Sequence, residues 1–149
     1  MSEKPSSSLP LPSERGDVPG YAWLEIIKRP SQEAFATAFT EDSVLDASVM
    51  PRSIIGAADI WALFDATRDM YETIAFKRET ITGSQTYLEW EGVFEGAQVA
   101  GVTILKRDSA GLIESIRLYH RPIGAVIAFS AELARRLAGK MTTDPFRRP

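Results

Sequence analysis

The chain has 149 residues, of which 44% are hydrophobic and 25% charged, a composition typical of one globular domain. Its formal net charge of −3 gives no indication of nucleic-acid binding, and no apolar run approaches the roughly 18 residues that span a bilayer. The lack of cysteine excludes disulfides, thiol catalysis and thiolate metal sites. The N-terminus also lacks the apolar core of an export signal, so we expect a cytoplasmic protein with no nucleic-acid and no membrane partner.

The two ends of the chain differ in composition from its middle. Residues 1–19 are rich in Ser and Pro and poor in apolar residues, which predicts a flexible N-terminal arm. Residues 141–149 are similar and predict a flexible tail, in which Phe146 is a candidate for docking on the body or on a partner chain. A single domain is therefore expected at 20–140.

The first half of this domain predicts helices and one strand. A short helix is expected at 21–28, ended by Pro30, and Ser31 is a fair N-cap for a second helical segment. A strand is expected at 44–49. The stretch 56–70 predicts a longer helix, because its apolar residues recur at three- and four-residue spacing.

The second half predicts strands joined by glycine-containing turns. They are expected at 74–81, 86–94, 98–107 and 112–120. Pro122 is suited to open a last helix, because proline fits the first helical position. That helix is expected to carry one apolar face, made of Ile123, Val126, Ile127, Leu133 and Leu137.

Helices followed by a run of antiparallel strands predict an α+β fold, with a curved sheet wrapped around the N-terminal helices. The segments Phe39-Thr-Glu-Asp-Ser-Val-Leu-Asp46, Gly56-Ala-Ala-Asp-Ile60 and Gly111-Leu-Ile-Glu-Ser-Ile-Arg-Leu-Tyr-His120 occur in that order. In this order of elements the chain resembles the nuclear transport factor 2-like, or SnoaL-like, superfamily. The resemblance implies a cystatin-like cone with a cavity. It does not choose a function, because the family includes ketosteroid isomerases, limonene-epoxide hydrolase, polyketide cyclases, dehydratases and non-catalytic modules.

Alternation along the strands predicts which side chains face the cavity. In the strand 86–94 the apolar set is Leu88, Trp90, Gly92 and Phe94, and in the last strand the inward set ends with Leu118 and His120. The strand 98–107 is apolar on both faces, so its pattern leaves the inward face open. A homodimer, in which a second copy covers the outer face of this strand, would account for that pattern.

The resemblance also implies positions for catalytic groups. The aspartate base of ketosteroid isomerases falls on Ala47, and their hydrogen-bonding acid falls on Thr103. The catalytic positions of limonene-epoxide hydrolase fall on Trp90, Gly92 and Leu118. None of these residues is acidic. Asp46 points away from the cavity, unless the first strand is shifted by one residue.

Two residues are candidates for catalysis. His120, the only histidine, is a candidate general base or acid, and a hydrogen-bonded ring at a strand end is the alternative. Asp46 is a candidate carboxylate base if it faces inward, and an exposed strand residue otherwise. The candidates for lining the cavity are mostly apolar, and core packing is the alternative for them: Phe64, Leu88, Trp90, Phe94, Thr103, Leu118 and Tyr71.

Two functions follow from this pattern. The first is binding of a small hydrophobic molecule, with acid/base isomerisation, cyclisation or hydration of a steroid- or polyketide-like compound. We expect this chemistry to use no metal and no cofactor, because the sequence has no recognisable metal-ligand spacing and no phosphate-binding glycine loop. The alternative is a non-catalytic binding or dimerisation module whose cavity is filled by its own side chains, with Phe64, Trp90 and Phe94 in contact.

Overall fold

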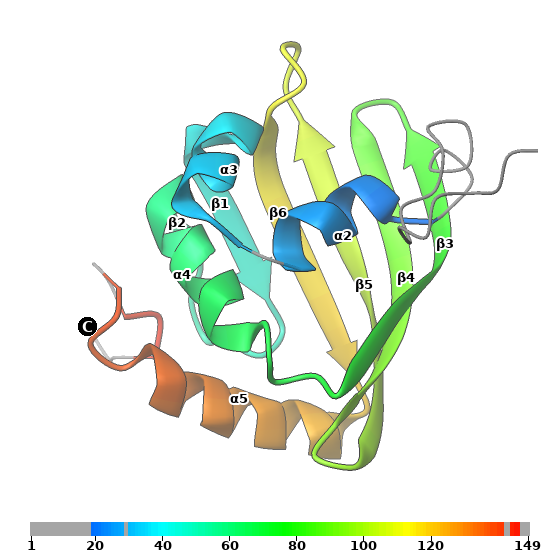
Figure 1. The fold of residues 1–149 in the computed structure, drawn as a ribbon, viewed down its shortest axis with the longest axis vertical. Coiled ribbons are helices and arrows are strands. Elements are labelled where there is room, and N and C mark those ends of the chain that lie inside the picture. Colours follow the sequence, from blue (N-terminus) through cyan, green and yellow to red (C-terminus); the bar gives the residue numbers. More distant parts are fainter. Residues whose placement is uncertain (1–18, 29, 142–143, 147–149) are drawn as a thin grey trace, which may run out of the picture.

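The computed structural model describes residues 19–28, 30–141 and 144–146, in which four helices lie along one six-stranded sheet (Figure 1). The predicted arm at 1–19 lies outside these residues except for Pro19. The helices are α2 (Tyr21–Lys28), α3 (Gln32–Ala38), α4 (Ala57–Thr67) and α5 (Ile123–Leu137). The strands are β1 (Phe39–Ala47), β2 (Ile54–Ile55), β3 (Thr73–Thr82), β4 (Gln85–Phe94), β5 (Ala97–Arg107) and β6 (Ile113–Arg121).

The sheet has the order β2-β1-β6-β5-β4-β3. Only β1 and β6 are parallel, and the other neighbouring pairs are antiparallel. The sheet curves around the N-terminal helices, and α5 closes one end of the molecule (Figure 1). The predicted α+β fold is confirmed. In the described part of the chain, no helix is both long and apolar enough to cross a membrane.

Most elements lie where the sequence predicts them, and the exceptions have local causes. The Ser31 hydroxyl accepts a hydrogen bond from the N–H of Ala34 at 3.0 Å, so it caps α3 as expected. The first strand begins at Phe39, earlier than predicted, and its pairing with β6 is irregular between Phe39 and Val44. Such an irregularity disturbs the alternation on which the prediction rested. The strand β2 is only two residues long and has no detectable pattern.

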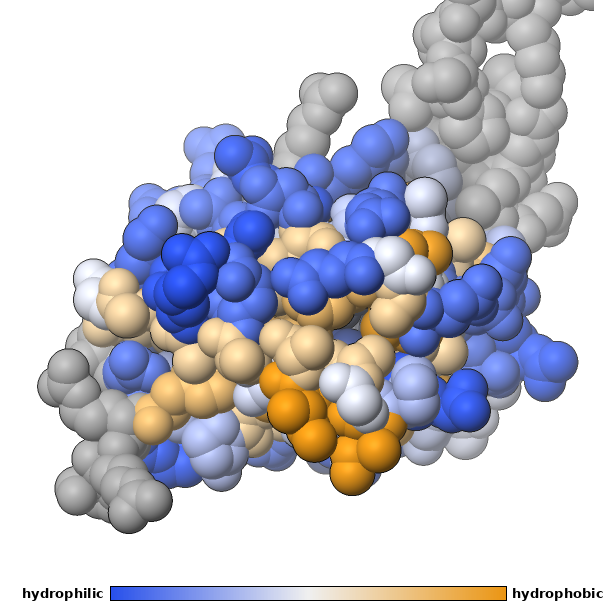
Figure 2. Space-filling view, turned by 90° about the horizontal axis from the view of Figure 1, so that it is seen from below, coloured by the Kyte–Doolittle hydropathy of each residue, from blue (hydrophilic) through white to orange (hydrophobic). Residues whose placement is uncertain are grey.

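The predicted apolar face of α5 is confirmed at Leu133 and Leu137, which are both fully buried, and is wrong at its start. Ile123 and Ile127 are 78% and 63% exposed, and the buried residues follow a row spaced by four: Ala125, Phe129, Leu133 and Leu137. In the first two turns of α5 the buried positions are therefore Ala125 and Phe129 instead of Ile123 and Ile127. Figure 2 views the molecule from below, the side on which α5 lies, and shows hydrophobic residues gathered among polar ones.

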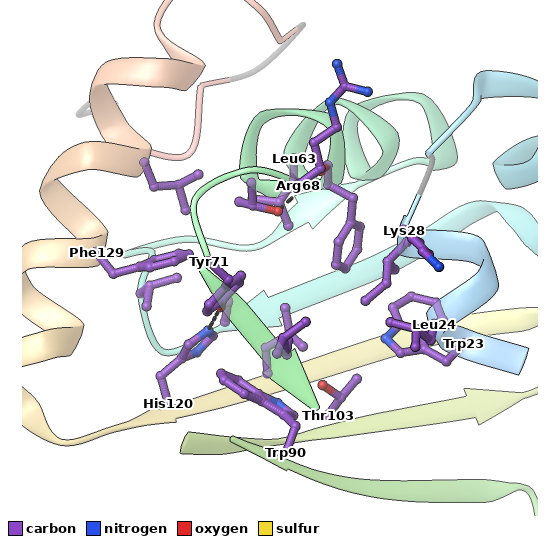
Figure 3. Close-up of a pocket in the computed structure, with 18 of the residues that line it drawn as sticks. Trp23, Leu24, Lys28, Leu63, Arg68, Tyr71, Trp90, Thr103, His120 and Phe129 are labelled. Carbon is purple, nitrogen blue, oxygen red and sulfur yellow. Dashed lines mark hydrogen bonds between the residues drawn. The ribbon is translucent and has the colours of Figure 1, made fainter. Parts of the chain in front are cut away.

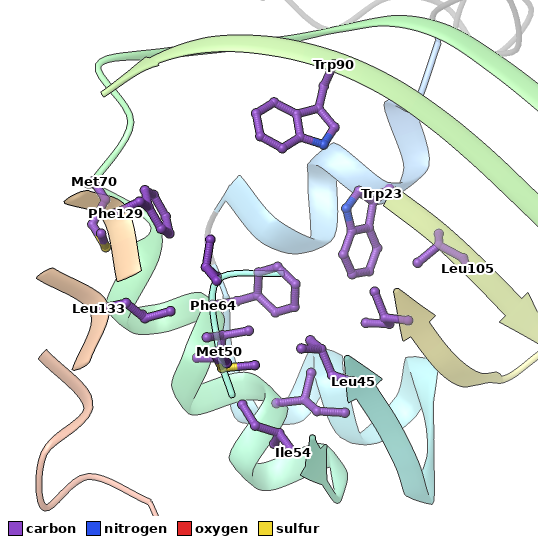
Figure 4. Packing of buried hydrophobic residues seen from close by; sticks show 14 of the residues in the cluster. Trp23, Leu45, Met50, Ile54, Phe64, Met70, Trp90, Leu105, Phe129 and Leu133 are labelled. Carbon is purple, nitrogen blue, oxygen red and sulfur yellow. The ribbon is translucent and has the colours of Figure 1, made fainter. Parts of the chain in front are cut away.

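The core lies between the inner face of the sheet and the helices (Figure 4). Trp23 of α2, Phe64 of α4 and Leu133 of α5 come from three different helices and are all buried. The tail also contributes, because Phe146 packs against the core and the Arg52 side chain donates to the carbonyl oxygen of Asp144 at 3.2 Å. Of the two docking surfaces expected for Phe146, the structure shows the body.

One row across the sheet brings bulky side chains together. Phe76, Trp90, Gly101 and His120 are direct neighbours on β3, β4, β5 and β6. A Cβ atom at Gly101 would lie 2.2 Å from the Tyr119 carbonyl oxygen and 2.5 Å from the Trp90 ring. Glycine therefore lets the Trp90 indole lie across β5, where its centroid is 5.1 Å from that of His120.

We expect Gly101→Ala to destabilise the protein by about 3 kcal/mol, because the added methyl overpacks a site bounded by backbone. Gly124→Ala is the matched control: a Cβ added there would meet no atom within 4 Å, and alanine favours the helix by about 0.5 kcal/mol. Urea unfolding of both variants measures the difference. Equal free energies of unfolding in the two variants would show that position 101 tolerates a side chain.

Candidate functional site

A cavity of about 170 Å³ lies between the inner face of the sheet and the helices (Figure 3). The sheet contributes Trp90, Thr103, Leu118 and His120, and Ala47 lies beside Leu118 on β1. The helices and the α4–β3 connection contribute the opposite wall, which includes Trp23, Leu63, Phe64, Tyr71, Phe129 and Leu133. The lining is therefore largely aromatic and aliphatic.

Two groups of aromatic rings flank this cavity. One group joins Trp23 to Phe64, with centroids 5.4 Å apart, and continues to Phe35 and Phe39. No ring contact links it to the second group within the described part of the chain. Since Phe64 belongs to the first group and Trp90 to the second, the rings that would fill the cavity are held apart.

The second ring group surrounds His120. It consists of His120, Tyr71, Trp90, Phe94 and Phe129, and its members lie 5.0 to 5.6 Å from their neighbours, centroid to centroid. Phe129 reaches from α5 onto both Tyr71 and His120. The imidazole is thus enclosed by rings from the sheet, the α4–β3 connection and the last helix.

Three polar groups form a chain through this second ring group. The Tyr71 hydroxyl lies 3.0 Å from Nε2 of His120, and the Ser48 hydroxyl lies 3.4 Å from Nδ1 of the same ring. The backbone N–H of His120 donates to the Ser48 oxygen at 2.9 Å, which fixes the serine against the strand end. Figure 3 shows Tyr71 and His120 facing each other at one wall of the cavity.

The surroundings keep both members of this pair neutral. Burial lowers the pKa of His120 from 6.5 to about 4, because the charged imidazolium is poorly solvated there. Burial raises the pKa of Tyr71 far above its usual value of 10, because the phenolate is disfavoured for the same reason. At neutral pH the cavity wall therefore carries a neutral imidazole and a neutral phenol.

The remaining polar groups of the cavity are mostly hydrogen-bond donors. Lys28 and Arg68 lie at the ends of α2 and α4, and among the described residues that line the cavity none is acidic. The indole N–H groups of Trp23 and Trp90 make no hydrogen bond within the described residues. Among the described side chains of the lining, only the Thr67 and Thr103 hydroxyls add acceptors that are not already used in the Tyr71–His120 pair. An excess of donors in a mostly apolar cavity favours a ligand that supplies oxygen atoms.

Most of the residues predicted to line the cavity do lie at its wall: Phe64, Tyr71, Trp90, Thr103, Leu118 and His120. Leu88 and Phe94 are 1% and 3% exposed and lie in the core beyond this wall. Both face inward as alternation predicts, but Phe94 packs on Phe129, and Leu88 lies beyond Thr103 in the same sheet row. An inward direction alone does not decide between cavity and core.

Asp46 lies outside the cavity. The first strand pairs Leu45 with Ile116 and Ala47 with Leu118, so the register is the unshifted one. Asp46 is exposed on the opposite face, where it accepts a hydrogen bond from the Ser53 hydroxyl. The carboxylate is therefore not positioned to act on a molecule in the cavity.

The sequence does not identify several residues of the site, among them Ser48, Phe129 and Trp23. Ser48 follows the end of β1, and only its position 2.9 Å from the His120 backbone makes it part of the site. Phe129 does not stand out, because Ile123 and Ile127 favour a neighbouring stripe at the start of α5. Trp23 has a detectable signal: it is the largest apolar side chain of the short helix 21–28.

Comparisons of sequence find no matching family model and no matching curated protein. Comparisons of structure find many matches. An uncharacterised protein with a cystatin-like fold from Silicibacter pomeroyi superposes with a TM-score of 0.75 at 17% identity, over 86% of this chain and 92% of that one. A steroid delta-isomerase from Pseudomonas aeruginosa gives 0.73 at 21% identity, over 91% of this chain and 100% of that one.

A third similar structure holds a bound molecule. It is a protein with a ketosteroid isomerase-like fold from Catenulispora acidiphila in complex with trimethylamine, with a TM-score of 0.56 at 21% identity, over 74% of this chain and 89% of that one. The structural neighbours include NTF2-like, SnoaL-like and ketosteroid isomerase-like proteins. The chain has their cystatin-like fold. The predicted resemblance is thus confirmed at the level of the fold.

The enclosure of His120 predicts an unusual titration. Since this is the only histidine, the untagged protein has one imidazole signal, and we expect its NMR titration to have a midpoint near pH 4. The Tyr71→Phe variant should keep a lowered midpoint, because burial is the main cause. A midpoint near 6.5 in the folded protein would contradict the enclosed site.

Stability provides a second measurement of the same property. Between pH 6.5 and pH 4 the unfolded chain binds a proton at His120 that the folded chain does not, so the free energy of unfolding falls as pH falls. Because one pKa unit corresponds to about 1.4 kcal/mol and the side chain is only half-buried, we expect a loss of about 2 kcal/mol across this window. His120→Gln should remove this part of the pH dependence.

Proposed function

We propose that the protein binds a small, mostly apolar carbonyl compound in this cavity and polarises its carbonyl oxygen with the Tyr71 hydroxyl. The observation that carries the proposal is the neutral Tyr71–His120 pair at the wall of an apolar cavity. A hydrogen-bond donor in such surroundings acts strongly on developing negative charge, because little water competes for it. The protein is then an acid/base isomerase, cyclase or hydratase that uses no cofactor.

The hydrogen-bond chain gives each member a role. The Ser48 oxygen accepts from the His120 backbone, so its own hydrogen is free to donate to Nδ1. The imidazole then carries its proton on Nε2 and donates to the Tyr71 oxygen. This leaves the Tyr71 O–H for the ligand oxygen. Tyr71 is thus the catalytic residue of the proposal, and His120 and Ser48 position it.

The cavity volume limits the size of the ligand. A dry cavity of about 150 Å³ holds a molecule of the size of benzene, and pockets for drug-sized ligands have about 300–1,000 Å³. At about 170 Å³ this cavity suits a compound with one or two rings. The fold shared with a steroid delta-isomerase supports carbonyl chemistry, but we propose a smaller compound than a four-ring steroid.

A second candidate function is binding without catalysis. Its support is the absence of acidic groups among the described residues that line the cavity, since the chain offers no carboxylate there to remove a proton from carbon. This alternative shares the ligand class with the first proposal and differs in the outcome of a turnover measurement. The filled-cavity version is disfavoured, because Phe64 and Trp90 lie in separate ring groups.

A two-ring ketone distinguishes the two functions. We expect 1-indanone to bind and to quench the fluorescence of Trp23 and Trp90. We also expect faster exchange of its α-hydrogens with deuterated solvent, in which a solvent molecule takes the α-proton while the Tyr71 O–H stabilises the enolate oxygen that forms. Tyr71→Phe should slow this exchange by about 100-fold, the typical cost of removing one such donor. Tyr119→Phe is the control, because this tyrosine is 49% exposed and does not line the cavity.

Each outcome tests a different part of the proposal. Binding with no accelerated exchange would support the binding module. Exchange that is equally fast in Tyr71→Phe would overturn the role of Tyr71, and absence of binding would overturn the ligand class.

We also propose that the protein is a homodimer through the outer face of β5. The support is that the outward residues along β5, Ala100, Val102 and Ile104, are apolar. Val102 has the half-exposed Tyr119 of β6 on one side and Glu89 of β4 on the other. Tyr119→Glu should then give a monomer in light scattering, because it places a charge in the interface. A monomeric wild-type protein would contradict this proposal.

A further inference from the structure

We infer that the ligand is an amphipathic acid whose carboxylate is held at the cavity mouth by Lys28 and Arg68, with the apolar body inside. The inference rests on the proposed function, because it names the ligand class of the same cavity. It adds a charge requirement that a carbonyl compound as such does not have.

The exposed lining residues identify the mouth. Thr103 and Trp90, at the sheet wall, are 2% and 3% exposed, whereas Lys28 is exposed and the Arg68 side chain is 57% exposed. Figure 3 shows Arg68 extending away from the sheet and Lys28 lying near Trp23 on the α2 side. Both residues line the cavity, so a ligand that fills it has two cationic side chains among its neighbours.

These charges are weakly compensated by the protein itself. Arg68 has an ion pair with Asp65 at 3.8 Å, and the Asp65 side chain is 43% exposed. Lys28 has no ion pair within the described part of the chain. The described lining residues include no acid, so Lys28 and Arg68 are the charged side chains that the lining offers to an incoming group.

The interior groups disfavour a cationic group inside the cavity. Trp23 and Trp90 present N–H donors that have no partner within the described residues, and neither can accept a hydrogen bond. An acid with an apolar body buries its ring against Phe64 and Phe129 and leaves its charge at the mouth, where water still solvates it. The desolvation cost of a buried charge is thereby avoided.

A cationic ligand is the main competitor. Aromatic rings attract quaternary ammonium groups, and this cavity is lined by several. In aromatic cages of this kind an acidic side chain commonly adds to the attraction, whereas here Lys28 and Arg68 oppose it. The two charges therefore favour the anion over the cation.

Three probes of similar size test the inference by calorimetry. They are 3-phenylpropanoate, its neutral amide, and (2-phenylethyl)trimethylammonium. At low ionic strength we expect the carboxylate to bind about 10-fold more tightly than the amide, and this advantage should shrink at high salt because the charges are exposed. The ammonium compound should bind more weakly than the amide.

Charge variants locate the effect. Lys28→Gln and Arg68→Gln should each lower the affinity for the carboxylate by about 3-fold and change the affinity for the amide by less than twofold. Arg78→Gln makes the same charge change away from this cavity and should change the binding of neither probe. Asp65→Asn should raise the affinity for the carboxylate, because it removes the ion pair that Arg68 makes with Asp65.

Each result has a distinct meaning. Equal binding of amide and carboxylate would overturn the charge requirement and leave the proposed function standing. Tightest binding of the ammonium compound would also overturn it. If none of the probes binds but 1-indanone does, the acid class is wrong, and if 1-indanone also fails to bind, the proposed function fails with it.

Discussion

The contact of Trp90 with His120 across Gly101 is the constraint on which the site depends. Two bulky inward-facing rings on β4 and β6 are separated by a strand whose residue at that position has no side chain. The indole therefore leans over β5 and forms one wall of the imidazole pocket. Without this gap Trp90 would be forced toward the helices, into the space that the cavity occupies. The same glycine thus shapes the wall and maintains the opening.

The helices complete the enclosure from the other side. Phe129 of α5 packs on Tyr71 and His120, so the last helix orders the pair, and Trp23 of α2 packs on Phe64 of α4. The rings of each group pack against one another with centroids about 5–6 Å apart, which is the favoured range for aromatic pairs. These contacts stabilise each group separately. A collapse of the cavity would disrupt both sets of contacts. The opening is therefore a consequence of good packing on either side of it.

The sequence predicted what periodicity encodes and missed what depends on three-dimensional proximity. Alternation correctly gave the inward faces of β4 and β6, since one face of each strand is much more apolar than the other. Alternation leaves the inward face of β5 open, because its two faces are similarly apolar. On α5 the helical pattern is right at Leu133 and Leu137 and wrong at Ile123 and Ile127, which are exposed. Lys28 and Arg68 gave no signal, because cations at helix ends are ordinary. Ser48 joins the site only through the parallel pairing of β1 with β6.

The electrostatics of the pair restrict the chemistry that the site performs. Burial moves the two pKa values apart, down for His120 and up for Tyr71, so transfer of a proton from the phenol to the imidazole is unfavourable in the resting protein. An ionised base is thus absent at neutral pH, and no carboxylate among the described residues replaces it at the cavity wall. A ligand oxygen that gains negative charge changes this balance, because the phenol and the indole N–H groups are donors that stabilise it without reorganising. The site is built to stabilise charge that develops on the ligand, and a charge that is already present is best left at the mouth.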